Sequence, residues 1–201
     1  METDSLLDLY RNFYFSSFLP AYADLTGYTL KKHDTVLFSI DSAHSHLMQY
    51  LSPDLDLDAR EQNLRKAQGH IERATLDCYK LLWLFVEEDL TSLMGDAEKR
   101  VLCVNMVESD LVSKYHEALA KILESRHCEL QNVGINLIDT IEKYRAAIEV
   151  TKEIIENVDR RAIELYEKKK KRQKWIDIGI GIIIGIIGST LSAPIITFLF
   201  Q

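Results

Sequence analysis

The chain has 201 residues, about the size of one domain, with 24 Lys and Arg against 31 Asp and Glu and a net charge of −7. Its charge is divided unevenly: residues 1–166 carry 29 acidic and 18 basic side chains, residues 168–174 add six basic ones, and residues 178–200 carry none. This distribution argues against an ordinary water-soluble globule, a secreted disulfide-rich domain and a protein that coats DNA generally.

The N-terminus is acidic and has neither the basic region nor the apolar core of a signal peptide, so we expect the first part of the chain to stay in the cytosol. The three cysteines, Cys78, Cys103 and Cys128, lie in helical apolar patterns and are expected to be reduced core residues. The sequence has no metal-ligand spacing, glycine-rich phosphate loop, GxSxG, HExxH or Cys-x-x-Cys motif. We therefore expect neither an enzyme nor a bound metal or cofactor.

The apolar pattern has a helical period throughout, and it predicts an all-α fold in which residues 1–166 form an elongated up-down bundle. The expected helices run from about residue 4 to Pro20, then over 35–51 with Asp34 as cap, 57–94, 97–130 and 137–165. Turns are expected at Pro53, Gly95 and Gly134.

Alternating steps of three and four residues predict which side chains each long helix buries. The helix over 57–94 is expected to bury Leu64, Ala67, Ile71, Ala74, Cys78, Leu81 and Phe85. The helix over 97–130 is expected to bury Val104, Val107, Leu111, Tyr115, Ala118 and Ile122. The last helix shows a heptad seam of Leu137, Ile141, Tyr144, Ile148, Thr151, Ile155, Val158, Ala162 and Leu165.

One side of the helix over 57–94 carries a basic stripe, unusual in so acidic a region. Its members are Arg60, Arg65, Lys66, His70, Arg73 and, beyond an interruption at Asp77, Lys80. Such a stripe could bind an anionic ligand, such as a nucleotide or a short oligonucleotide. The alternative is a solvated face paired with acidic side chains elsewhere in the bundle.

Residues 167–177 form a basic collar with Lys168, Lys169, Lys170, Lys171, Arg172 and Lys174. Such a cluster binds anionic lipid headgroups and keeps its own side of a membrane protein in the cytoplasm. Because residues 168–174 are good helix formers, the preceding helix is expected to continue unbroken through the collar.

Residues 178–200 are expected to form a single transmembrane helix, about 34 Å long at 1.5 Å per residue, with Trp175 at its cytoplasmic boundary. The predicted location is therefore the membrane, crossed once, with the N-terminal domain in the cytoplasm. The alternative is a buried core helix of a soluble protein.

Small residues fall on one face of this predicted span, at Gly181, Gly185, Gly188 and Ser192. Spacings of four, three and four residues let helix backbones approach closely in lipid, which predicts self-association and a narrow pore lined by this face. Asp177 would then form a ring of carboxylates at the cytoplasmic mouth. The alternatives are an anchor that merely tolerates glycine and an Asp177 that pairs with Lys174.

A helical cytosolic bundle, a basic collar and a glycine-striped C-terminal span together resemble small bacterial antiphage membrane effectors, in particular the channel effectors of Hailong-type systems. The resemblance implies a tetramer-like oligomer in the bacterial inner membrane. Ligand contacts on the bundle would open or close it, and its activity would kill or arrest the infected cell. The competing class is a tail-anchored adaptor or tether whose bundle binds a cytosolic protein partner.

Overall fold

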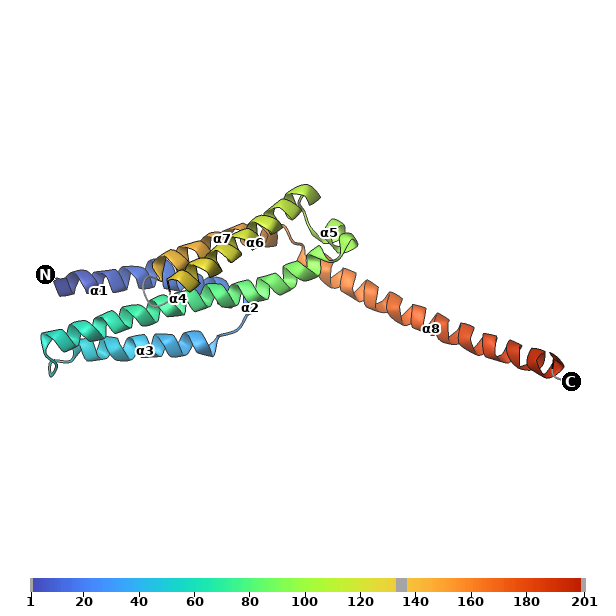
Figure 1. Cartoon of the computed structure of the whole chain (residues 1–201), viewed down its shortest axis with the longest axis horizontal. Helices are drawn as coiled ribbons and strands as arrows, with labels where there is room; N and C mark the ends of the chain where they lie inside the picture. The colour runs from blue at the N-terminus through green and yellow to red at the C-terminus, as the bar shows by residue number, and fades with distance from the viewer. Residues whose placement is uncertain (1, 133–136, 200–201) are drawn as a thin grey trace. The chain divides into compact units, whose positions relative to one another are not determined.

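The computed structural model describes residues 2–132 and 137–199, without the side chains of residues 2–6, 9 and 185–199. The described residues form helices and no strand, apart from an isolated antiparallel bridge between Val104 and Val158 (Figure 1). The predicted all-helical bundle is confirmed.

Short connecting segments join successive helices along the chain (Figure 1). They are α1 (Glu2–Phe13), the π-helical turn η1 (Tyr14–Phe18), α2 (Leu19–Thr29), α3 (Asp34–Leu51), α4 (Leu57–Met94), α5 (Ala97–Cys103), α6 (Glu108–Gln131), α7 (Ile138–Glu156) and α8 (Arg160–Leu199). The predicted bounds of α4, the end of α3 and the turns at Pro53 and Gly95 are confirmed, whereas Gly134 lies outside the described residues. The prediction that Asp34 caps α3 is wrong, because Asp34 is the first residue of the helix and His33 occupies the cap position.

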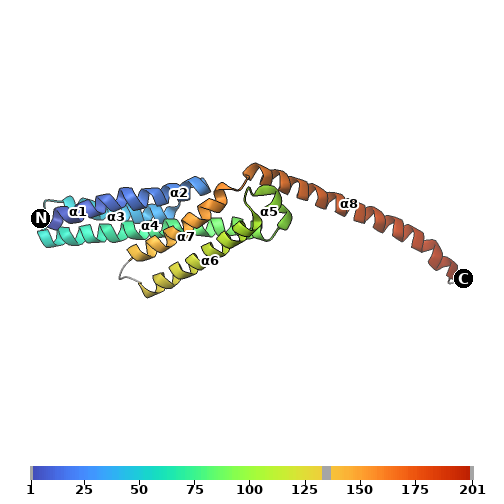
Figure 2. The same ribbon diagram turned by 90° about the horizontal axis from the view of Figure 1, so that it is seen from above.

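The chain divides into two compact units. The first comprises Met1–Asp96 and Met106–Asn157, and the second comprises Ala97–Asn105 and Val158–Gln201. In the first unit α4 is the central helix, about 57 Å long at 1.5 Å per residue. The helices α2, α3 and α7 pack against α4, and α6 packs against α7 (Figure 2).

The buried face of α4 follows an eleven-residue repeat rather than the predicted heptad. Ten of its buried residues lie in rows spaced by eleven: Leu64, Thr75 and Val86; Ala67 and Cys78; Ile71, Leu82 and Leu93; Tyr79 and Leu90. Eleven residues per three turns is 3.67 per turn, close to the natural 3.6, whereas a heptad drifts around a straight helix. The predicted seam is therefore confirmed as far as Cys78 and wrong at Leu81, which is half-buried, and Phe85, which is exposed.

Pro20 does not end the first helix, contrary to the prediction. It lies in the first turn of α2, directly after the π-helical turn η1. A proline lacks the amide proton and its ring clashes with the carbonyl four residues earlier, and the wider π-turn relieves both conflicts. The helical path continues to Leu30, which caps α2 in the left-handed conformation at φ 55°.

The two other predicted long helices are each broken. The helix expected over 97–130 divides into α5 and α6, and Val107 is exposed in the extended link between them. The helix expected over 137–165 ends at Glu156, and a new helix begins after Asp159, whose carboxylate accepts a hydrogen bond from the Ala162 amide (2.9 Å). An aspartate at this position is a strong helix cap. Leu165, expected in the seam, is consequently 59% exposed.

Candidate functional site

In the second unit, α5 is fastened to the first turns of α8. The Asp159 amide donates to the Cys103 carbonyl (2.8 Å), and the buried Lys99 ammonium pairs with Glu167 (2.8 Å). A third contact joins Lys169 to Glu98 at 3.9 Å. We call this set of contacts the α5 clamp; it holds the helix at the point where the basic collar begins.

The collar itself is fully exposed. All six basic residues, Lys168, Lys169, Lys170, Lys171, Arg172 and Lys174, are exposed on α8, which passes through the collar without a break as the sequence predicted. The Lys170 ammonium lies 5.6 Å from the centre of the Tyr166 ring. Asp177 accepts a hydrogen bond from the Gln173 amide (2.8 Å) rather than pairing with Lys174. The cluster therefore presents its positive charge to solvent around the helix.

Directly after the collar, α8 exposes large apolar side chains. Trp175 is 66% exposed, and the isoleucines at 176, 178, 180, 182, 183 and 184 are 44–64% exposed. A Cβ added at Gly179 or Gly181 would meet no atom within 4 Å, so both glycines face open space. The side chains of Gly185, Gly188 and Ser192, the other predicted pore residues, lie outside the described residues. Within the part of the chain that the structure describes, no helix combines the length and apolar character that crossing a membrane requires.

The members of the basic stripe on α4 do not form one site, because each makes different contacts. The Arg60 Nε donates to the Tyr50 carbonyl (2.7 Å), with its guanidinium 5.3 Å from the centre of the Tyr50 ring. Arg65 pairs with Glu61 one turn earlier (2.6 Å). Lys66 and Arg73 are exposed. Two of the five predicted ligand residues therefore serve local contacts, and two face solvent.

His70, the fifth predicted ligand residue, joins α4 to α3. Its ring stacks on that of His46, with centroids 5.4 Å apart, and His46 Nδ1 lies 2.9 Å from Asn63 Oδ1. Burial, followed by the nearby charges of Arg73 and His46, lowers the pKa of His70. The fold therefore favours the neutral form of the His70 imidazole at the α3–α4 seam.

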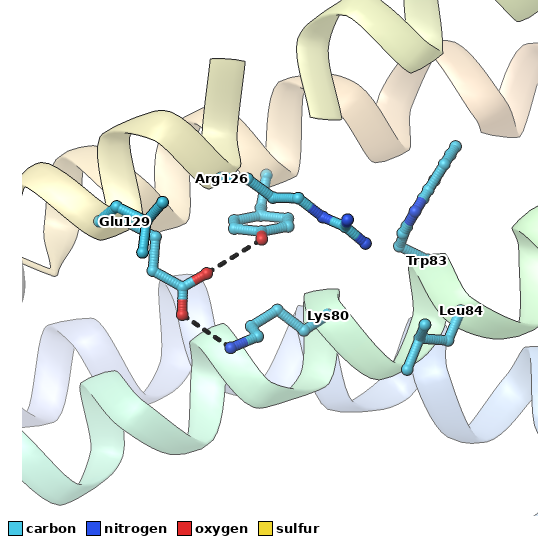
Figure 3. Close-up of a pocket in the computed structure, with 7 residues that line it drawn as sticks. Lys80, Trp83, Leu84, Arg126 and Glu129 are labelled. Carbon is cyan, nitrogen blue, oxygen red and sulfur yellow. Dashed lines mark hydrogen bonds and ion pairs between the residues drawn. The ribbon is translucent and has the colours of Figure 1, made fainter. Parts of the chain in front are cut away.

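Lys80, the last member of the stripe, lies instead in a pocket of about 350 Å³ between α4, α6 and α7. The pocket is lined by Lys80, Trp83, Leu84, Arg126, Glu129, Leu130 and Tyr144. Glu129 joins its walls: its carboxylate accepts from Lys80 Nζ (2.7 Å) and from the Tyr144 hydroxyl (3.1 Å) (Figure 3). We call this the α4–α6–α7 pocket.

Burial and the Glu129 carboxylate raise the pKa of Tyr144 to about 12, so its hydroxyl stays protonated and donates to Glu129. The sequence predicted Lys80 as a member of the basic stripe, but no sequence pattern predicts its ion pair with Glu129, which lies 49 residues later. Arg126 and Tyr144, which complete the pocket, lie on α6 and α7, for which the sequence predicted only packing against the bundle.

The three cysteines, Cys78, Cys103 and Cys128, are free and buried, as predicted. Burial raises the pKa of the Cys78 thiol, which keeps it in the unreactive protonated form. Among the described residues, no three His, Cys, Asp or Glu side chains come together in a way that could hold a metal ion.

Comparison with protein families, with curated proteins and with solved structures gave no match.

Proposed function

We propose that the chain is an oligomeric membrane effector that forms an ion channel or pore through residues 178–200 and acts in bacterial antiviral defence. The cytosolic helical bundle would gate it in response to an anionic nucleotide or oligonucleotide. The observation that carries the proposal is the order of surfaces along the continuous helix α8, where an exposed basic collar is followed at once by exposed isoleucines.

The exposed isoleucines favour an apolar environment for this part of α8. Moving one large aliphatic side chain from water to such an environment is worth about 1.5–3 kcal/mol, and six isoleucines follow the collar within nine residues. The collar adds about 1 kcal/mol per basic residue near an anionic membrane surface. Both terms act in the same direction only if the collar lies at the headgroups and the isoleucines enter the lipid.

The small-residue face supports association of several copies. Gly181 faces open space, so another helix can approach its backbone without displacing any side chain of its own chain. In the proposed pore this face continues through Gly185, Gly188 and Ser192, and Asp177 lies at the cytoplasmic mouth as a ring of carboxylates.

The decisive experiment is ion flux through liposomes containing the full chain, in wild type, Gly181→Leu, Gly185→Leu and Gly179→Leu. Gly179 is the matched control, since it also faces open space but lies two residues, about 200°, from Gly181 around the helix. We expect flux to be lost in Gly181→Leu and Gly185→Leu and kept in Gly179→Leu. Unchanged flux in the first two variants, or equal loss in all three, would refute the pore face.

A tail-anchored adaptor is the second candidate, and exposed apolar side chains on α3 favour it. They are Leu37, Phe38, Met48 and Leu51, which could contact a protein partner. Native mass spectrometry of the full chain in detergent separates the two functions. Four or more copies support the effector, whereas a monomer or dimer supports the adaptor.

A further inference from the structure

We propose that the α4–α6–α7 pocket binds a small anion that carries a planar aromatic ring, and that this ligand replaces Glu129 as the partner of Lys80. The pocket would be the site at which the ligand of the proposed function binds. The biological consequence of this binding rests on the proposed function. Binding itself is measurable without ion conduction, so the two can fail independently.

The charges around the pocket leave room for an anion. Among the residues that line the pocket, Lys80 and Arg126 contribute two positive charges and Glu129 one negative charge. The Lys80–Glu129 pair is partly open to solvent, with 40% and 27% of the two side chains exposed. The Arg126 guanidinium lies close enough to the Tyr144 hydroxyl to lower its pKa by charge and by a hydrogen bond, and among the described residues Arg126 has no carboxylate partner. An incoming phosphate or carboxylate could therefore bind Arg126 directly and compete with Glu129 for Lys80.

The other side of the pocket suits a flat apolar ring. Trp83 is 4% exposed overall, yet it lines the pocket together with the exposed Leu84 and Leu130. The Arg126 guanidinium extends from α6 toward Trp83 (Figure 3). A planar ring bound here could stack on the guanidinium and contact the indole. The volume of about 350 Å³ is at the lower end of the range for small-molecule sites and fits a ligand of mononucleotide size or smaller.

Occupation of the pocket would tie α6 to α4. In the structure α6 packs on α7 and α7 packs on α4, while the Lys80–Glu129 ion pair reaches directly from α4 to α6. An anion held by both Lys80 and Arg126 would make the same bridge with two cations instead of one. Ligand binding would thus fix the distance between α4 and α6 and release the Glu129 carboxylate.

The test is a fluorescence titration of the full chain in detergent. The chain has two tryptophans, so Trp175→Phe leaves Trp83 as the reporter. The probes are adenosine 5′-monophosphate and nicotinate, one a ring with a phosphate and the other a ring with a carboxylate. The reference compounds are adenosine, which lacks the anion, and inorganic phosphate, which lacks the ring. We expect at least one probe to quench Trp83 saturably and to bind at least tenfold more tightly than both reference compounds.

Three variants locate the site. Arg126→Gln should weaken binding at least tenfold, whereas Arg145→Gln, a matched exposed arginine on α7 paired with Glu142, should not change it. Glu129→Gln should strengthen binding, because it removes the carboxylate that competes for Lys80. Binding by the nucleotide alone identifies a phosphate ligand, and binding by nicotinate alone identifies a carboxylate. No probe binding more tightly than the reference compounds, or weaker binding in Glu129→Gln, would overturn the proposal.

Discussion

Truncation of Leu82 should destabilise the bundle much more than truncation of its neighbour Leu81. Leu82 is 3% exposed and lies in the same row as Ile71 and Leu93, whereas Leu81 is half-buried at the edge of the packed face. Leu82→Ala removes three carbon groups, worth about 2.4 kcal/mol at about 0.8 kcal/mol each, and leaves a cavity. The expected loss in the free energy of unfolding is about 3–4 kcal/mol for Leu82→Ala and about 1 kcal/mol for Leu81→Ala.

Urea unfolding followed by Trp83 fluorescence in the Trp175→Phe background measures this difference, because the indole of Trp83 is buried in the same unit. The two variants delete the same atoms from adjacent positions of one helix, so helix propensity and unfolded-state effects cancel between them. Equal losses, or a larger loss for Leu81→Ala, would show that α4 packs in the heptad register and would refute the eleven-residue face.

Three further outcomes are expected. Because burial lowers the pKa of His70, the unfolded chain binds a proton more readily, and stability falls as the pH drops below about 6.5. His70→Gln should flatten this part of a plot of melting temperature against pH, and an unchanged slope would contradict the shift. Glu129→Gln should lower the pKa of Tyr144 from about 12, because it removes a charge and a hydrogen bond that raise this pKa, measured by absorbance at 295 nm against Tyr144→Phe. An unchanged value would show that Glu129 does not raise the pKa of Tyr144. Asp159→Ala should cost about 0.5–2 kcal/mol of local stability at the start of α8, seen as faster hydrogen exchange at the Ala162 amide, and unaltered exchange would show that the cap contributes nothing.

Periodicity together with proline and glycine at the ends was sufficient to predict where α4 begins and ends. Pro53 precedes α4 and Gly95 follows it, and both ends were predicted correctly because proline and glycine often interrupt a helix. Pro20 did not, because a π-helical turn precedes it. The buried face of the same helix was predicted less well. A pattern with steps of three and four can be read as a heptad over two turns, and only a helix as long as α4 reveals the drift.

The break before α8 shows how capping can override an apolar seam. Val158, Ala162 and Leu165 continue the heptad of α7, but the cap at Asp159 begins a new helix within that seam. A heptad pattern shows which residues could pack against another helix, but it does not show where a helix begins or ends. A single capping hydrogen bond can fix that point. The interpretation of residues 137–165 as one continuous helix was therefore wrong.

The two candidate ligand sites also differ in how far the sequence could predict them. The basic stripe on α4 was visible because its members share a helical spacing, yet Arg60 and Arg65 are held by Tyr50 and Glu61. The α4–α6–α7 pocket depends on residues from three helices that are far apart in the sequence, Lys80, Arg126 and Tyr144. No spacing rule brings such residues together, because their meeting is decided by how α6 and α7 pack beside α4.

The pocket lies between α4 and α6, and the segment that joins these two helices in the sequence is α5. The helix α5 is thus joined in the sequence to both helices that the proposed ligand would bridge. The α5 clamp in turn fastens α5 to α8 through the Cys103 carbonyl and Lys99, at the turns that lead into the collar. Because of the break at residues 157–159, α7 and α8 are separate helices, and no single rigid helix runs from α7 into the collar.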